Sequence, residues 1–121
     1  MKIIWLTGVS LVACASNEAA TAPTTVTSAE ITVEVDTATE RITTDRCDRQ
    51  ISCGNIGRGR RFGNRSACES DARAGARNVL GRSCSTVDPT RLRACLDDIR
   101  NQPCEEAGNF PLSCEGVRLC R

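Results

Sequence analysis

Cysteine placement constrains the fold of this chain more than any other feature of its sequence. The chain of 121 residues carries nine cysteines. Apart from Cys14, they lie in the C-terminal part of the chain, at Cys47, Cys53, Cys68, Cys84, Cys95, Cys104, Cys114 and Cys120. An even set of cysteines in a short exported domain is typical of a disulfide framework. We therefore expect these eight residues to form four disulfides.

The same region is poor in large apolar side chains. After Trp5 the only aromatic residues are Phe62 and Phe110. A domain of fewer than roughly 80 residues with so small a core usually needs covalent cross-links. Each native disulfide typically contributes about 2–5 kcal/mol to stability.

The N-terminus predicts export and a lipid anchor. A positive start is followed by an apolar run over Ile3–Ala13, which is too short to span a bilayer. The run ends in Leu11-Val12-Ala13-Cys14, which resembles the lipobox of bacterial lipoproteins. We expect a signal peptide over residues 1–13 and acyl chains, such as palmitate, on Cys14. The alternative is an ordinary secretory signal followed by an incidental cysteine.

The residue after the lipidated cysteine bears on location. By analogy with lipoproteins, Ala15 rather than aspartate favours release to the outer membrane of a Gram-negative cell. We expect an anchored protein of the cell envelope, with its domain facing the periplasm or the cell surface.

Residues 14–44 predict an acidic linker that is disordered. The segment is rich in threonine, alanine and glutamate, and it lacks aromatic residues and further cysteines. Ile31, Val33 and Val35 alternate with polar residues, as in a strand that pairs with an edge. A lone strand is more typical of a linker, and thirty flexible residues would span roughly 30 Å.

Two helices are signalled within the predicted domain, residues 45–121. The first follows a capping box, Ser66-Ala67-Cys68-Glu69, and stops at Gly81, with a predicted ion pair between Glu69 and Arg73.

The second helix begins with Asp88 as its cap and Pro89 at its first position, and it ends before Pro103. Shorter helices are expected over residues 45–53 and 113–120. The predicted fold class is mainly α: a small disulfide-rich domain with two main antiparallel helices and one or two short ones.

An antiparallel pair of main helices would bring specific cysteines together. It predicts the bridges Cys84–Cys95 and Cys68–Cys104, and antiparallel outer helices then give Cys47–Cys120 and Cys53–Cys114. This is one of 105 possible arrangements.

The residue types argue against catalysis. The chain has no histidine, so the usual general base for a nucleophile is missing. The adjacent acids Asp97-Asp98 and Glu105-Glu106 are best interpreted as solvated charges, since neighbours on a helix do not share a face. The sequence has no Cys-x-x-Cys motif, which is the pattern that would indicate redox chemistry or a zinc site. We expect no enzyme, no cofactor and no metal.

The segment from Gly54 to Arg65 is the best candidate for binding. It places Arg58, Arg60, Arg61 and Arg65 among glycines, and guanidinium groups grip anions through paired hydrogen bonds. An envelope component or an acidic partner protein suits an exported domain, whereas nucleic acid does not, and no small-molecule substrate is indicated. The alternative is a structural turn with solvated arginines.

The cysteine spacing also resembles a known family. The similarity lies in Cys47-x5-Cys53, Asn55-Ile56-Gly57-x-Gly59, Phe62, Cys68, Leu92-x2-Ala94-Cys95-Leu96-x2-Ile99-Arg100 and Leu119-Cys120. These features resemble uncharacterised cysteine-rich lipoproteins of myxobacterial type, which contain a domain of unknown function and are labelled natural-product-biosynthesis lipoproteins. Phe62 stands where an aromatic, often tyrosine, is expected. The resemblance covers residues 45–121 and the lipid signal, and it implies no reaction.

Three hypotheses of function follow. The first is a membrane-anchored, non-catalytic interaction module that presents the arginine segment, in a role accessory to natural-product biosynthesis. The second is an inhibitor or accessory subunit of an exported enzyme. An enzyme that uses carboxylates comes third.

Overall fold

A computed structural model describes residues 32–81 and 84–121 of the chain. The predicted signal peptide, Cys14 and the first part of the predicted linker lie outside these residues. The elements in chain order are β1 (Val33–Glu34), α1 (Val35–Ser52), α2 (Arg65–Leu80), β2 (Thr86–Val87), α3 (Pro89–Asn101), the 3₁₀ helix η1 (Leu112–Cys114) and α4 (Gly116–Leu119). The mainly helical fold class and the four disulfides are confirmed.

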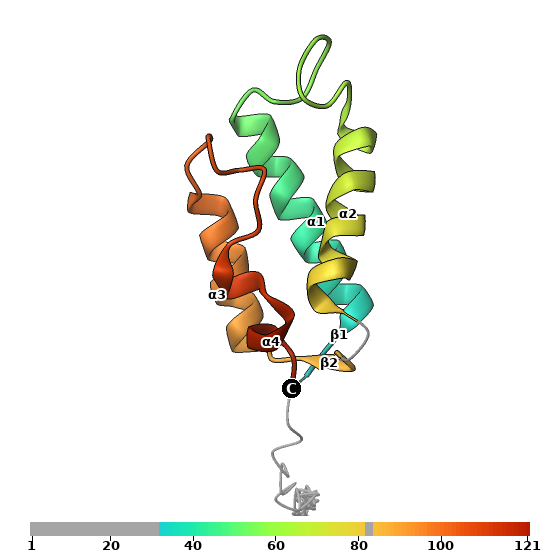
Figure 1. Cartoon of the computed structure of the whole chain (residues 1–121), viewed down its shortest axis with the longest axis vertical. Helices are drawn as coiled ribbons and strands as arrows, with labels where there is room; N and C mark the ends of the chain where they lie inside the picture. Colours follow the sequence, from blue (N-terminus) through green and yellow to red (C-terminus); the bar gives the residue numbers. More distant parts are fainter. Residues whose placement is uncertain (1–31, 82–83) are drawn as a thin grey trace, which may run out of the picture.

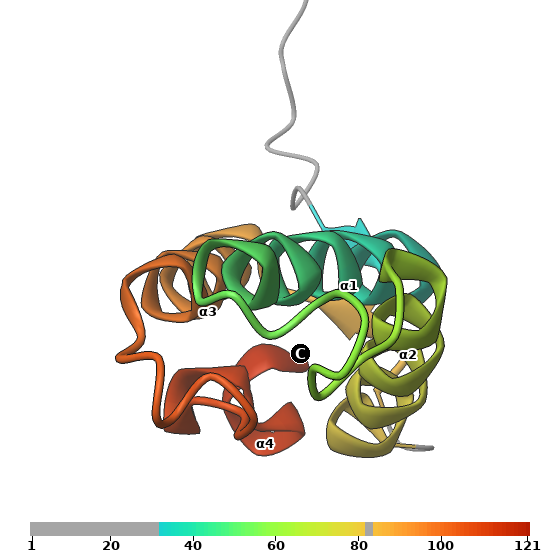
Figure 2. The same cartoon turned by 90° about the horizontal axis from the view of Figure 1, so that it is seen from above.

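Helix α1 is the centre of the molecule. It packs against α2 on one side and α3 on the other, and the segment of η1 and α4 lies over α3 (Figures 1 and 2). The two short strands form an antiparallel pair at the end of the molecule where the C-terminus also lies (Figure 1). We call this end the base, and the opposite end, which carries the loop of residues 53–64, the distal end.

The predicted boundary between linker and domain at residue 45 is wrong. Residues 33–44 form β1 and more than half of α1, so the domain begins well before the first of its cysteines. The buried face of α1 explains the error. It carries Ala38, Thr39, Ile42, Thr43, Arg46, Cys47 and Gln50, a set in which Ile42 is the only large aliphatic side chain.

Helix α2 ends at Gly81 as predicted, but it begins two residues earlier than the capping box at Ser66 implied. The cap is Asn64, whose side-chain oxygen accepts a hydrogen bond from the Ala67 backbone N–H at 2.9 Å. The predicted pairing of Glu69 with Arg73 is replaced by two others. Glu69 binds Arg65, and Arg73 binds Glu40 of α1.

Helix α3 has the predicted start and end. Asp88 caps it by accepting from the backbone N–H groups of Thr90 and Arg91, with Pro89 in the first turn. The single helix expected over residues 113–120 is instead divided into η1 and α4 at Glu115.

All four predicted disulfide pairings are wrong. The bridges are Cys47–Cys68, Cys53–Cys104, Cys84–Cys120 and Cys95–Cys114. The prediction assumed that the two main helices pack on each other, whereas α1 lies between them (Figure 2). Cys47–Cys68 therefore joins α1 to α2, and Cys95–Cys114 joins α3 to η1. Four disulfides indicate an oxidising, extracytoplasmic compartment.

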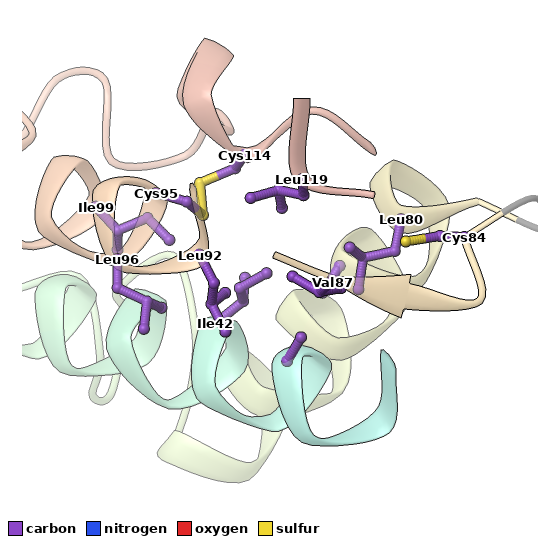
Figure 3. Packing of buried hydrophobic residues seen from close by; sticks show 12 residues of the cluster. Ile42, Leu80, Cys84, Val87, Leu92, Cys95, Leu96, Ile99, Cys114 and Leu119 are labelled. Atoms are coloured by element: carbon purple, nitrogen blue, oxygen red, sulfur yellow. A yellow bond between two sulfur atoms is a disulfide. The ribbon is translucent and has the colours of Figure 1, made fainter. Parts of the chain in front are cut away.

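Two disulfides reach the main apolar cluster, and one of them, Cys95–Cys114, has both of its cysteines buried there. Cys95 and Cys114 are fully buried, and their bridge lies beside Leu119, Leu92 and Ile99 (Figure 3). Ile42 enters from α1 and Leu80 from α2, so every helix contributes to this cluster. Among the described residues, no helix combines the length and the apolar character that a membrane span requires.

Candidate functional site at the distal loop

The loop of residues 53–64 is a defined turn. The Phe62 N–H donates to the Asn55 carbonyl at 3.0 Å, and the Gly57 N–H donates to the Phe62 carbonyl at 2.8 Å. Gly57 and Gly59 have φ angles of 138° and 73°, a region in which other residues are strained. The glycines therefore let the chain reverse tightly between its two halves.

The loop is also fixed to the helices beneath it. Cys53 is bridged to Cys104, and the Asn55 side chain donates to Gln50 Oε1 at 2.7 Å. At the end of the loop, Cys68 of α2 is bridged to Cys47 of α1. The backbone that carries the arginines is thus held at both ends by covalent bonds.

Three of the four predicted arginines lie on this loop. Arg58 and Arg60 are exposed and make no ion pair or side-chain hydrogen bond within the described part of the chain. The Arg61 guanidinium lies 5.4 Å from the centre of the Phe62 ring and packs against Gly108, where a Cβ would collide with it. These three side chains are available to an anion.

Arg65 does not belong to the site. It is the first residue of α2, and it binds Asp48 Oδ1 at 2.8 Å and Glu69 Oε1 at 2.6 Å. The hydrogen bonds that Arg65 donates to Asp48 and Glu69 raise the pKa of its guanidinium. Its charge is already matched, so the predicted group of four arginines is reduced to three.

A further arginine, Arg46, was missed by the sequence analysis and lies beneath the loop. Arg46 of α1 is buried, its Nη2 donates to the Gly108 carbonyl at 3.1 Å, and its guanidinium lies 3.8 Å over the Phe110 ring. Burial lowers the pKa of Arg46. The signal was its spacing of four residues from Ile42 and from Gln50 on one face of α1.

The segment of residues 102–110 forms the other side of the distal end. Arg49 donates twice to the Gln102 carbonyl, at 2.8 and 2.6 Å, and Gln50 donates to the Ala107 carbonyl at 2.7 Å. The segment also exposes Glu105 and Glu106. The distal end thus carries three arginines on one loop and two glutamates on the next.

The adjacent carboxylates of α3 do not form a shared site. Asp97 binds Arg100 at 3.2 Å, whereas Asp98 accepts a hydrogen bond from the Ser113 hydroxyl. Both side chains are exposed. Across residues 32–81 and 84–121, no group of three cysteine or acidic residues is arranged to hold a metal ion.

Comparison with known proteins gives a family and no activity. A family model described as "Family of unknown function (DUF6184)" matches residues 47–121. No curated protein and no solved structure matches the chain.

Proposed function

This chain belongs to the DUF6184 family of unknown function, and we propose that it is a lipid-anchored envelope protein whose distal arginine loop binds an anionic partner. The lipobox-like sequence at Cys14 supports the anchor, and the four disulfides agree with export. Neither the anchor nor export requires a catalytic activity of the domain.

The observation that supports this function most is that the arginine loop and the start of β1 lie at opposite ends of the molecule. Val33 lies at the base, and α1 then runs through the molecule to the distal end (Figure 1). An α-helix of 18 residues is about 27 Å long. An anchor at Cys14 would therefore leave the arginine loop on the side away from the membrane.

The chemistry of the loop selects the class of partner. Arg58 and Arg60 present planar guanidinium groups on a backbone that needs no rearrangement to bind. Guanidinium forks match phosphate and carboxylate groups. Phosphorylated or acidic glycans of the envelope, or an acidic partner protein, offer such groups outside the cytoplasm. A binding role of this kind also suits an accessory protein of a biosynthetic pathway.

The test is binding of the purified full chain to lipopolysaccharide, measured by surface plasmon resonance at two salt concentrations. Replacing Arg58→Ala together with Arg60→Ala should weaken binding about tenfold, since each exposed charge contributes up to about 1 kcal/mol. The matched control is Arg41→Ala with Arg93→Ala, which removes the same charge from the sides of α1 and α3. It should leave binding unchanged.

Equal loss in both double variants would show that net charge, and not the loop, governs binding. The anchor is tested separately by mass spectrometry of protein from native membranes. The protein should begin at Cys14, without residues 1–13, and Cys14 should carry the mass of acyl chains. A chain that still begins at an unmodified Met1 would contradict the anchor.

A further inference from the structure

A groove between α3 and the α4 segment has no role in the function proposed above. It has a volume of about 440 Å³ and is lined by Arg91, Ala94, Ser113, Val117 and Arg118. Val117 is 87% exposed, and Leu112, one residue before Ser113, is 67% exposed. Both values are high for large aliphatic side chains in so small a domain, so this face is a candidate for contact with another apolar phase.

The groove lies close to the point where the described chain begins. Val33 pairs with Val87, and Val87 pairs on its other side with Cys120. Neighbouring strands are about 4.8 Å apart, which places Val33 within roughly 10 Å of Cys120. Val117 is three residues before Cys120, on the short helix α4. The exposed face and the start of β1 thus share the base of the molecule (Figure 1).

The rim of the groove is cationic. The Arg91 guanidinium lies at its edge, where it donates to the Arg118 carbonyl at 3.2 Å. Arg118 is exposed, and its ion pair with Glu115 is long, at 3.8 Å. Glu115 offsets part of the charge, which leaves an apolar strip beside a modest excess of positive charge. This combination suits an interface with anionic head groups and acyl chains.

We propose that this face, centred on Val117 and Arg118, docks on the anionic lipid surface to which the chain is anchored. The proposal rests on the lipid anchor of the proposed function. The seventeen residues from Ala15 to Ile31 would span on average roughly 23 Å as an unstructured chain. The anchor would therefore hold the base at a high local concentration beside the bilayer.

A membrane fits this face better than a protein partner does. Two aliphatic residues and one alanine, without an aromatic anchor, are too few for the centre of a stable protein interface. They are sufficient for a weak second contact, because the acyl chains on Cys14 would already hold the protein at the bilayer.

The test uses tryptophan fluorescence, for which this chain is well suited. Its only tryptophan is Trp5, and it has no tyrosine. Cleavage before Cys14 removes Trp5, so Val117→Trp places a single reporter on α4 of the mature chain, and Ile51→Trp places one at the distal end of α1, where Ile51 is 47% exposed. The mature acylated chain is reconstituted into vesicles of phosphatidylcholine with phosphatidylglycerol, with or without brominated acyl chains.

The proposal predicts blue-shifted emission and strong quenching by brominated lipid for Val117→Trp, and neither for Ile51→Trp. Equal quenching at both sites, or none at Val117→Trp, overturns it. A blue shift that needs no vesicles and grows with protein concentration would assign the face to self-association, and also overturns it.

The charge contribution is tested in the chain that lacks the signal peptide and carries Cys14→Ser, which has neither the apolar run of residues 3–13 nor an acyl group. Arg118→Gln should weaken sedimentation with the anionic vesicles about fivefold, because one basic residue near such a surface contributes about 1 kcal/mol. A larger loss with Arg60→Gln would show that the distal loop docks instead. Absence of acyl mass on Cys14 would contradict the anchor alone, whereas weaker sedimentation of Arg118→Gln in the Cys14→Ser chain would still report the docking face.

Discussion

At the scale of single residues, Asp88 connects two distant parts of the chain. Its Oδ1 accepts the backbone N–H groups of Thr90 and Arg91, at 2.9 and 3.0 Å, and its Oδ2 accepts from Arg121 Nε at 2.9 Å. The backbone N–H of Arg91, followed by the Arg121 side chain, lowers the pKa of Asp88. One carboxylate therefore begins α3 and holds the last residue of the chain.

The lowered pKa predicts how stability depends on pH. A carboxylate whose folded pKa is below its unfolded value of about 3.9 stabilises the fold above that value. The contribution is lost as the pH falls through the folded pKa. Asp88→Asn should therefore be less stable than the wild type in urea at pH 7, and the difference should shrink as the pH falls below the unfolded pKa. Parallel profiles for the two proteins from pH 7 to pH 2.5 would contradict this.

Arg46 shows why one side of the candidate site could not be predicted. Its Nε and Nη1 have no hydrogen-bond partner among the residues that the structure describes. Burial of such a group is normally unfavourable, and here the Phe110 ring and the Gly108 carbonyl compensate in part. Both partners lie more than 60 positions away in the sequence, beyond the reach of any local pattern.

At the scale of elements, the start of α2 distinguishes two caps. The capping box predicted Ser66, whereas the side chain of Asn64 accepts the Ala67 N–H. Asn64→Ala should lower the free energy of unfolding by about 1 kcal/mol. Ser66→Ala, two positions later, should change it by less than about 0.5 kcal/mol. Urea denaturation followed by circular dichroism measures both, and the reverse order would restore the capping box.

The same contrast separates what the sequence could predict from what it could not. Asp88, Pro89 and Gly81 act on their own helix ends, so their effect was readable from the residues nearby. Helix α1 was missed up to residue 44 because its buried face is mostly small or polar, and only its packing between α2 and α3 makes it a core helix. Without it, the two main helices were wrongly paired with each other, and the disulfides inferred from that pairing were wrong.

The arginine loop follows the same rule. The exposed positions of Arg58, Arg60 and Arg61 were implied by the surrounding glycines, which exclude a helix or strand there. Arg65 was included wrongly, because one of its two ion-pair partners is Asp48 of α1. A partner on a separate helix leaves no trace in the local spacing.

At the scale of the whole molecule, the four disulfides differ in their access to solvent. Three of them have a buried cysteine at one or both ends: Cys47–Cys68, Cys84–Cys120 and Cys95–Cys114. The fourth, Cys53–Cys104, joins a half-buried residue to an exposed one at the distal end. Exchange with a thiol requires the attacking sulfur to reach the bond.

Limited reduction should therefore open Cys53–Cys104 first. A low concentration of dithiothreitol, followed by alkylation and peptide mass spectrometry, should label Cys53 and Cys104 before the other six cysteines. The three remaining bridges still join α1 to α2, α3 to η1 and the two sides of the base, so helical circular dichroism should persist.

Stability should fall by about 2–5 kcal/mol, and Cys53→Ser with Cys104→Ser should reproduce that loss. The loop would then keep its covalent tie through Cys47–Cys68 but would be held at its start only by noncovalent contacts, such as Asn55 with Gln50, so its affinity for anions should fall as well. Simultaneous labelling of all eight cysteines would contradict the order and show that the distal end does not open independently of the fold.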